Sequence, residues 1–225
     1  MKKTIGYVVV IALCIGGLIG EYLYLNRRNS PENREIIPPP TKQTGTLISV
    51  SGEFKLYMHN TLERYNNTKL RYILREGNRL QTSKDASAIF DGCIYPPDFN
   101  NPVRFFLREE SSIGIMKSPA IDIEKGSFIA SVPSNSMGLN VVMKLPDNPN
   151  WAQCLANDAD LLVSRDNNRL YVCVYRGKAR LWNAKGEIII NENHEGSIIP
   201  DEAPDEAKPV ISIELPKELL ENKGK

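Results

Sequence analysis

The sequence predicts an all-β domain, and three observations carry that prediction. Residues 168–200 alternate apolar and polar side chains with a period of two, as a β-strand requires. Glycines recur there at roughly ten-residue spacing between β-branched and aromatic runs. Between residues 45 and 200 no apolar period of 3.6 residues is sustained. This pattern is typical of sandwiches, barrels and solenoids, and we expect a β-solenoid-like or sandwich fold of many short strands.

The same alternation places strands along the whole domain. In residues 170–175, Leu170, Val172 and Val174 point to one side of the strand and the intervening side chains to the other. We expect breaks at Lys125-Gly126 and Arg176-Gly177-Lys178, a loop insertion at 59–68, and loops at 96–102 and 145–150. The expected strands are 46–50, 54–58, 70–74, 80–82, 86–90, 103–107, 113–115, 121–123, 128–132, 139–143, 151–155, 159–163, 170–175, 179–182, 187–190 and 197–199.

Length and composition fit one globular domain with accessory segments. The chain has 225 residues, of which 41% are apolar and 24% charged, so wholesale disorder is excluded. The formal net charge is +1, and no basic stripe with interleaved aromatic residues occurs. We therefore expect no nucleic-acid partner.

Residues 1–28 are expected to form an N-terminal membrane anchor. The uncharged apolar run that starts at Ile5 extends, with flanking residues, to Leu25, and about 20 such residues span a bilayer core as a helix. Tyr22 and Tyr24 suit an interfacial aromatic belt. A cleaved signal peptide and a lipoprotein box at Cys14 are the alternatives. The large domain is expected outside the membrane, because long domains translocate largely regardless of charge.

Three further segments follow the anchor. Residues 29–44 contain three consecutive prolines, which favour polyproline II and predict a semi-stiff linker. Residues 45–200 form the expected β domain. Residues 201–225 begin with an acidic, proline-containing linker and end in a charged tail, in which 210–215 could add one edge strand.

Several segments resemble elements of FecR-type extracytoplasmic domains. The correspondence covers roughly Gly45 to Pro200, in the order and spacing of that family. The matching segments are Gly45–Gly52, Leu74–Thr82, Ser87–Gly92, Ile123–Phe128, Val172–Leu181 and Glu195-Gly196. The resemblance implies a bacterial, membrane-anchored protein with an extracytoplasmic all-β domain used in envelope signalling.

That resemblance also sets expectations for location and partner. It implies a single-pass protein of the inner (cytoplasmic) membrane with its main domain in the periplasm. Founding members of the family carry a cytoplasmic anti-sigma domain before the membrane helix, whereas only Met1–Thr4 stand there in this chain. We therefore expect the domain without that cytoplasmic part, and another envelope protein as the partner.

The inventory of chemical groups predicts no enzyme, no cofactor and no metal. His59 and His194 are the only histidines, and both fall in predicted turns without ligands at suitable spacing. Asp158 and Asp160 lack the further oxygen ligands of a calcium loop and are expected in a solvated turn. The four cysteines have no CxxC spacing, and the three beyond the anchor could form at most one disulfide.

Tyr171, Tyr175 and Trp182 are the candidate contact residues. With Trp151 they could form an aromatic platform, although core and strand-pair packing is the more usual role of aromatic side chains in strands. Two functions remain open. The first is a non-enzymatic envelope protein that binds another protein, by its turns or by strand addition at a sheet edge. The second is a glycan- or peptidoglycan-binding module with an exposed aromatic face.

Overall fold

The structure is a computed structural model, which describes residues 43–58, 61–63, 72–92, 102–116, 120–134, 136, 138–146 and 148–210. The predicted membrane anchor lies outside these residues, as does nearly all of the predicted linker. Within the described residues, no helix is long and apolar enough to cross a membrane.

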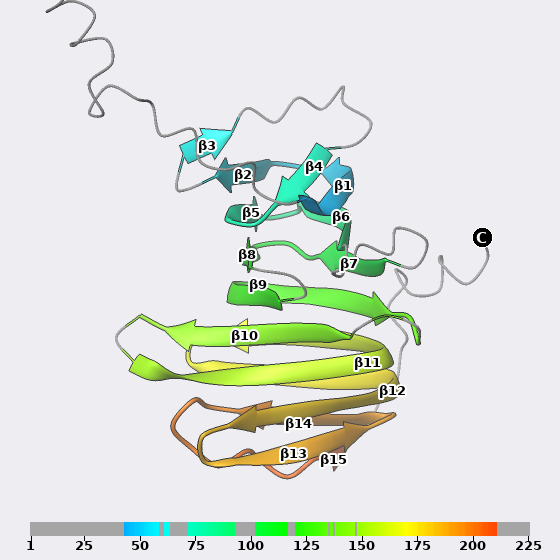
Figure 1. The fold of residues 1–225 in the computed structure, drawn as a ribbon, viewed down its shortest axis with the longest axis vertical. Helices are drawn as coiled ribbons and strands as arrows, with labels where there is room; N and C mark the ends of the chain where they lie inside the picture. The colour runs from blue at the N-terminus through cyan, green and yellow to red at the C-terminus, as the bar shows by residue number, and fades with distance from the viewer. Residues whose placement is uncertain are drawn as a thin grey trace, which may run out of the picture. The chain divides into compact units, whose positions relative to one another are not determined.

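The described residues form an all-β fold, which confirms the predicted fold class (Figure 1). Its strands are β1 (Gln43–Ser51), β2 (Phe54–Met58), β3 (Thr61–Glu63), β4 (Tyr72–Arg75), β5 (Asn78–Thr82), β6 (Ser87–Gly92), β7 (Val103–Leu107), β8 (Ser112–Ile115), β9 (Ala120–Val132), β10 (Leu139–Leu145), β11 (Asn148–Asp166), β12 (Arg169–Asn183), β13 (Gly186–Asn191), β14 (His194–Ile198) and β15 (Lys208–Pro209).

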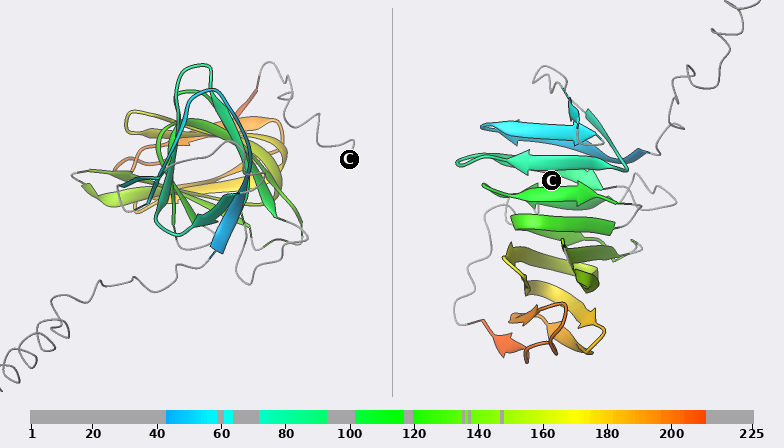
Figure 2. Two further views of the ribbon diagram at one scale, coloured as in Figure 1. Left: turned by 90° about the horizontal axis from the view of Figure 1, so that it is seen from above. Right: turned by 90° about the vertical axis from the view of Figure 1, so that its left-hand side faces the viewer.

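All described strands belong to one sheet, which folds back on itself into two facing layers and is not closed (Figure 2). Layer A contains β4, β1, β6, β7, the second halves of β9 and β11, the first half of β12, β14 and β15. Layer B contains β3, β2, β5, β8, the first halves of β9 and β11, β10, the second half of β12, and β13. Three long strands, β9, β11 and β12, therefore contribute to both layers.

The long strands change their inward-facing parity where they pass from one layer to the other. In β12 the buried residues are even-numbered up to Val174 and odd-numbered from Ala179 onward. The same switch occurs in β9 at Gly126 and in β11 near Asp158. Side chains alternate along a strand, and an extra residue at a bend, as in a β-bulge, shifts that alternation by one. On both sides of each bend the apolar residues face inside.

The bends use backbone conformations that glycine favours. Gly126 and Gly177 both have a φ of +79°, and Asp158 has a φ of +47°. A Cβ on Gly177 would lie 2.0 Å from the carbonyl oxygen of Asp158, so the two neighbouring bends also pack against each other. The other described residues with positive φ are Gly52, Gly77, Asp85, Glu110, Gly138, Asn167, Gly186 and Asn193.

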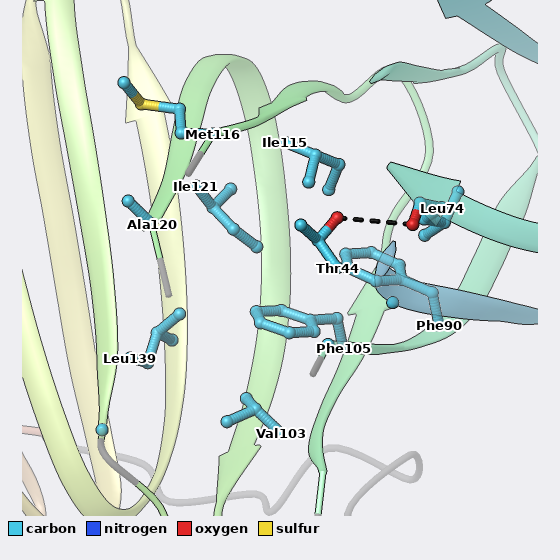
Figure 3. A pocket seen from close by; sticks show the side chains of 13 residues that line it. Thr44, Leu74, Phe90, Val103, Phe105, Ile115, Met116, Ala120, Ile121 and Leu139 are labelled. Carbon is cyan, nitrogen blue, oxygen red and sulfur yellow. Dashed lines mark hydrogen bonds between the residues drawn. The ribbon is translucent and has the colours of Figure 1, made fainter. Parts of the chain in front are cut away.

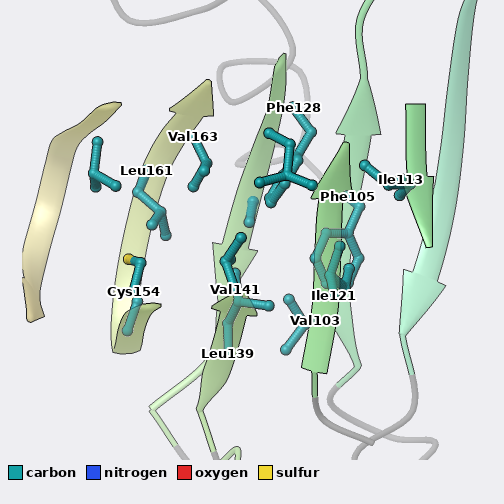
Figure 4. Close-up of a cluster of buried hydrophobic side chains, with 14 of the residues drawn as sticks. Val103, Phe105, Ile113, Ile121, Phe128, Leu139, Val141, Cys154, Leu161 and Val163 are labelled. Atoms are coloured by element: carbon teal, nitrogen blue, oxygen red, sulfur yellow. The ribbon is translucent and has the colours of Figure 1, made fainter. Parts of the chain in front are cut away.

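The larger of two apolar clusters in the described residues fills the space between the layers (Figure 4). Phe90 and Phe105 stack with ring centroids 4.5 Å apart, and Phe105 meets Phe128 edge-on at 5.8 Å. From layer B, buried residues such as Ile123 and Val141 belong to the same cluster. The predicted common direction of Leu170, Val172 and Val174 is confirmed, and the structure shows that this side is the buried one.

Several local predictions differ from the structure. Lys125-Gly126 and Arg176-Gly177-Lys178 do not end strands; they are bends inside β9 and β12. The predicted loop at 145–150 is short, because β11 already begins at Asn148. The region 59–68, expected as a loop, contains the short strand β3. Glycine and proline signals mark a change of direction, and a bend between layers gives the same signal as a turn.

Replacing Gly177 with alanine should destabilise the fold. The added Cβ meets the Asp158 carbonyl and the φ of +79° is unfavourable for alanine, so we expect a loss of about 2 kcal/mol in the free energy of unfolding. Urea denaturation followed by tryptophan fluorescence measures it. Gly114→Ala is the matched control, because its Cβ meets only the Asp122 Cβ at 3.6 Å. Equal losses in the two variants would contradict the role of the bend.

Candidate functional site

The three candidate aromatic residues lie on two different surfaces. Tyr171 and Tyr175 are on the outer face of layer A, opposite the buried Val172 and Val174, as the alternation predicted. Trp182 is on the outer face of layer B, because β12 passes between the layers at Gly177. Tyr171 is 41% exposed. The structure therefore brings the tyrosines together on one strand and separates them from Trp182.

A groove of about 370 Å³ lies on the outer face of layer A and includes Tyr171. We call it the outer groove. Strands β11, β12 and β14 form its floor, and the segment after β14 contributes to its wall. Its lining residues are Leu162, Ser164, Arg169, Tyr171, Val172, Cys173, Glu195, Gly196, Ser197, Asp205, Glu206 and Lys208. The groove thus combines an aromatic ring with charges of both signs.

Residues 199–207, which we call the strap, are bound to the end of the sheet. The Asn183 side-chain Nδ2 donates hydrogen bonds to the carbonyl oxygens of Ile199, at 2.6 Å, and Glu202, at 2.7 Å. The strap then leads into β15, which pairs with β14. Part of the segment expected as an acidic linker is therefore fixed to the domain. The composition of the segment gave no sign of this, because the bonds come from residues distant in sequence.

Asp205 is the residue that fastens the strap to the groove. Its carboxylate accepts hydrogen bonds from the Ser197 hydroxyl and the Arg169 guanidinium, and its backbone N–H donates to the Ser197 carbonyl at 3.0 Å. Arg169 also donates to the Ser197 hydroxyl at 3.0 Å and lies 5.9 Å from the Tyr171 ring centroid. The hydrogen bond from Ser197 and the charge of Arg169 hold the pKa of Asp205 below its ordinary value.

Cys173, at the floor of the groove, is not set up as a nucleophile. Burial raises the pKa of its thiol, and this outweighs the hydrogen bond with Tyr175, which lowers it. Cys154 is fully buried in the core, and burial raises the pKa of that thiol to about 12. Both cysteines are free. A thiol that stays protonated at neutral pH suits packing and weak polar contact with a ligand better than covalent chemistry.

An ion pair stabilises the bend of β11 and β12 next to the tyrosines. The Asp160 side chain is only 5% exposed, and it accepts hydrogen bonds from Arg176 Nε at 2.8 Å and from the Ser131 hydroxyl at 2.7 Å. Asp158 is exposed and receives a second bond from Arg176 at 2.6 Å. These hydrogen bonds raise the pKa of Arg176. The expectation of a solvated turn was therefore wrong for Asp160, because bending the strands brings Arg176 over it.

Trp182 belongs to a second exposed surface, on the outer face of layer B. It meets Trp151 edge-on, with ring centroids 6.4 Å apart, and the Arg180 guanidinium lies 5.4 Å from its ring centroid. We call Trp151, Leu155, Arg180, Trp182 and Ile189 the tryptophan patch. Trp151 and Leu155 are each 39% exposed and Ile189 is 57% exposed. Large exposed apolar side chains clustered in this way commonly mark a contact surface.

One carboxylate on the outer face of layer B, that of Asp122, lacks a hydrogen-bond partner for one of its oxygens. The Asp122 Oδ1 atom is buried and has no hydrogen-bond partner. Burial, and then the nearby charge of Glu124, raise the pKa of Asp122. By contrast, Glu124 accepts a hydrogen bond from the Ser112 hydroxyl at 2.6 Å and pairs with Arg79. The ionised form of Asp122 is therefore a cost to the folded state.

A small apolar cavity of about 30 Å³ lies between the layers at one edge (Figure 3). It is lined by side chains from both layers, including Phe105 and Leu139, and Thr44 donates a hydrogen bond to the Leu74 carbonyl beside it at 3.4 Å. That volume holds about one water molecule, so it is too small for an organic ligand. We interpret it as a packing gap.

Within the part of the chain that the structure describes, no group of three or more His, Cys, Asp or Glu side chains is arranged to hold a metal ion. His194, which is within these residues, has its Nδ1 2.9 Å from the Glu192 carbonyl oxygen. His59 lies outside them. What the described geometry offers is two contact surfaces, the outer groove and the tryptophan patch.

Comparison with known proteins adds little to this picture. No protein-family model and no curated protein matches the sequence. Two crystal structures of a protein from Parabacteroides distasonis, provisionally described as an anti-sigma factor, are similar to 58% of this chain. Their TM-scores are 0.42 and 0.35, with 9% and 8% sequence identity. The match spans 59% of each of those chains, and at these values it supports no conclusion about function.

Asp122→Asn should stabilise the protein at neutral pH. The folded state raises the pKa of this carboxyl, so its ionised form costs stability at every pH above that raised pKa. We expect a gain of about 1 kcal/mol at neutral pH, measured by urea denaturation. The gain should disappear as the pH falls below the ordinary value of 3.8, where both states are protonated. Glu124→Gln, the control, should instead destabilise, since it loses the ion pair with Arg79.

Asp205→Asn should loosen the strap. The pKa of Asp205 is depressed in the folded state, so its contribution to stability is present at neutral pH and is lost as the pH falls below 3.8 and through the folded pKa. At neutral pH we expect the backbone amides of residues 199–210 to exchange about tenfold faster in the variant. Glu206→Gln, which leaves the bonds of Asp205 in place, is the control. If exchange is unchanged in Asp205→Asn, the carboxylate does not hold the strap.

Proposed function

We propose that this protein is a non-enzymatic, membrane-anchored envelope protein whose FecR-like β domain binds another envelope protein through the outer groove. The apolar N-terminal segment supports an anchor, and the ordered motifs from Gly45 to Pro200 support a FecR-type domain with a role in envelope signalling. In this proposal the chain crosses the inner membrane once, and the domain faces the periplasm.

The outer groove is the observation that carries the proposal. It has room for several side chains of a partner, and Tyr171 stands at its surface with Arg169 beside the ring. Tyrosine and arginine are the residue types that most often dominate the energy of protein contacts. The strap and the ion pairs keep this surface ordered before binding, which reduces the entropy lost on association.

A binding role fits the chemistry better than catalysis does. The thiol in the groove has a raised pKa, and the carboxylates of Asp205 and Asp160 are both occupied by arginine and serine partners. A general base or a nucleophile has to be available to a substrate. These groups instead act on one another and fix the shape of the surface.

The tryptophan patch supports a second candidate function, which is binding of a glycan such as peptidoglycan. Trp151 and Trp182 meet edge-on at 6.4 Å, and Trp151 is 39% exposed. An exposed indole face suits the C–H face of a sugar ring, while Arg180 offers hydrogen-bond donors beside it. We rank this function second because it rests on an exposed patch alone, whereas the first function rests on a groove.

Two alanine variants of the full chain, solubilised in detergent, separate the two functions. Tyr171→Ala should weaken binding of the partner protein by about 10-fold or more, because a contact tyrosine carries about 1–2 kcal/mol or more of binding energy. The partner is isolated from envelope extract by its binding to the wild-type chain, and affinity is then measured by calorimetry. Ile48→Ala, 38% exposed on the outer face of layer A and away from the groove, is the control.

The second function makes the opposite prediction. If the protein binds glycan, Trp182→Ala should abolish sedimentation with purified peptidoglycan sacculi and Tyr171→Ala should leave it unchanged. Binding of a protein partner that is equally strong in the Tyr171→Ala and Ile48→Ala variants would refute the role of the groove. Circular dichroism checks that each variant keeps the β fold.

A further inference from the structure

The edge of layer B at the C-terminal end of the domain is formed by β13, and it is unusually open. Among the described residues, β13 pairs with β12 on one side and with no strand on the other. Pro204 of the strap lies 3.3 Å from the position of a Cβ on Gly186, the first residue of β13. The corresponding edge of layer A is different, because β15, which ends in Pro209, covers β14.

The sequence of β13 lacks the features that usually protect a sheet edge. It reads Gly-Glu-Ile-Ile-Ile-Asn, with no proline and no lysine inside the strand. Ile190 is fully buried and Ile188 packs partly against the core, whereas Ile189 points outward and is 57% exposed. Ile189 also belongs to the tryptophan patch, and it is the residue at which the patch reaches the open edge. A free edge with apolar side chains on both faces is a template for pairing with another strand.

We propose that two copies of this chain pair through β13, antiparallel, to form a symmetric dimer with a sheet continuous across the interface. The strand is complementary to itself in the register that sets Ile189 opposite Ile189 of the second copy. In that register Ile188 faces Ile190 of the second copy on the core side, so inward residues meet inward residues. Isoleucine pairs of this kind favour β-strand association.

Charge complementarity also favours a second copy of β13 over a strand of an unrelated protein. Lys185 precedes β13 and Glu192 follows it, and both are exposed. Antiparallel pairing of two copies brings the N-terminal end of one β13 beside the C-terminal end of the other. The two-fold axis therefore places Lys185 near Glu192 of the second copy at both ends of the interface. Glu187, the acidic residue within the strand, is already paired with Arg180 and adds no repulsion.

Dimerisation is independent of the outer groove, because β13 belongs to layer B and the groove lies on the outer face of layer A. Two copies joined in this way would each keep Tyr171 exposed. A partner protein with two binding regions would then meet two grooves at once, which raises its apparent affinity without any new contact.

Sedimentation velocity of the purified full chain in detergent tests the proposal. The wild type should form a reversible dimer, and Ile189→Lys should raise the dimer dissociation constant at least about tenfold, because a lysine at the edge blocks pairing. Ile189 is exposed, so the variant should keep its fold. Leu155→Lys, at an exposed position of the same patch away from the edge, is the control and should change the constant by less than about twofold. A wild-type chain that stays monomeric overturns the proposal.

A photo-cross-linker identifies what occupies the edge. Benzoylphenylalanine at position 189 should join two copies through peptides that both contain β13, and the same group at position 155 should not. A cross-link from position 189 to residues 211–225 of the same chain would show that its own tail covers the edge. A cross-link to a different protein would show an edge used for a heterologous partner. Either of these results, or no cross-link at all, contradicts the dimer.

Discussion

The alternation of side chains along a β-strand is the constraint on which the rest of this structure depends. A strand that passes from one layer of a folded sheet to the facing layer must still direct its apolar side chains inward. In this fold the long strands do so with a shift of the alternation by one residue at the bend. β9, β11 and β12 each make that shift, and Gly126, Asp158 and Gly177 have the positive φ that the bends need.

The bends also determine which aromatic side chains lie on the outer faces of the two layers. Because β12 turns over at Gly177, its first half displays Tyr171 on layer A and its second half displays Trp182 on layer B. One strand thereby supplies an aromatic residue to two surfaces that a single ligand cannot contact together. The two surfaces differ in character: the outer groove is lined by charged side chains of both signs, whereas the tryptophan patch is mainly apolar and reaches a free sheet edge.

Polar interactions near the outer groove serve mainly to fix its shape. Asp160 is buried and accepts hydrogen bonds from Arg176 and Ser131, and Asp205 fastens the strap to Ser197 and Arg169 of the sheet. A buried carboxylate is costly unless its hydrogen bonds are complete, so such groups appear where a defined geometry is needed. Asp122 is the contrasting case, because one of its oxygens is buried without a partner and its pKa is raised.

The sequence by itself determined the fold class, most strand positions and the shared side of Leu170, Val172 and Val174, because a period of two is a local property of the chain. It also singled out Tyr171 and Tyr175 as neighbours on one face. Only the tertiary structure decided that Gly126 and Gly177 are bends inside strands, that Trp182 faces away from the tyrosines, and that Asp160 is buried. Only the tertiary structure showed that the strap is held to the sheet. Its partners Asn183 and Arg169 are 16 to 36 residues away from the strap residues that they bind. Contacts between residues far apart in sequence depend on how the layers close on each other, and no local pattern encodes that.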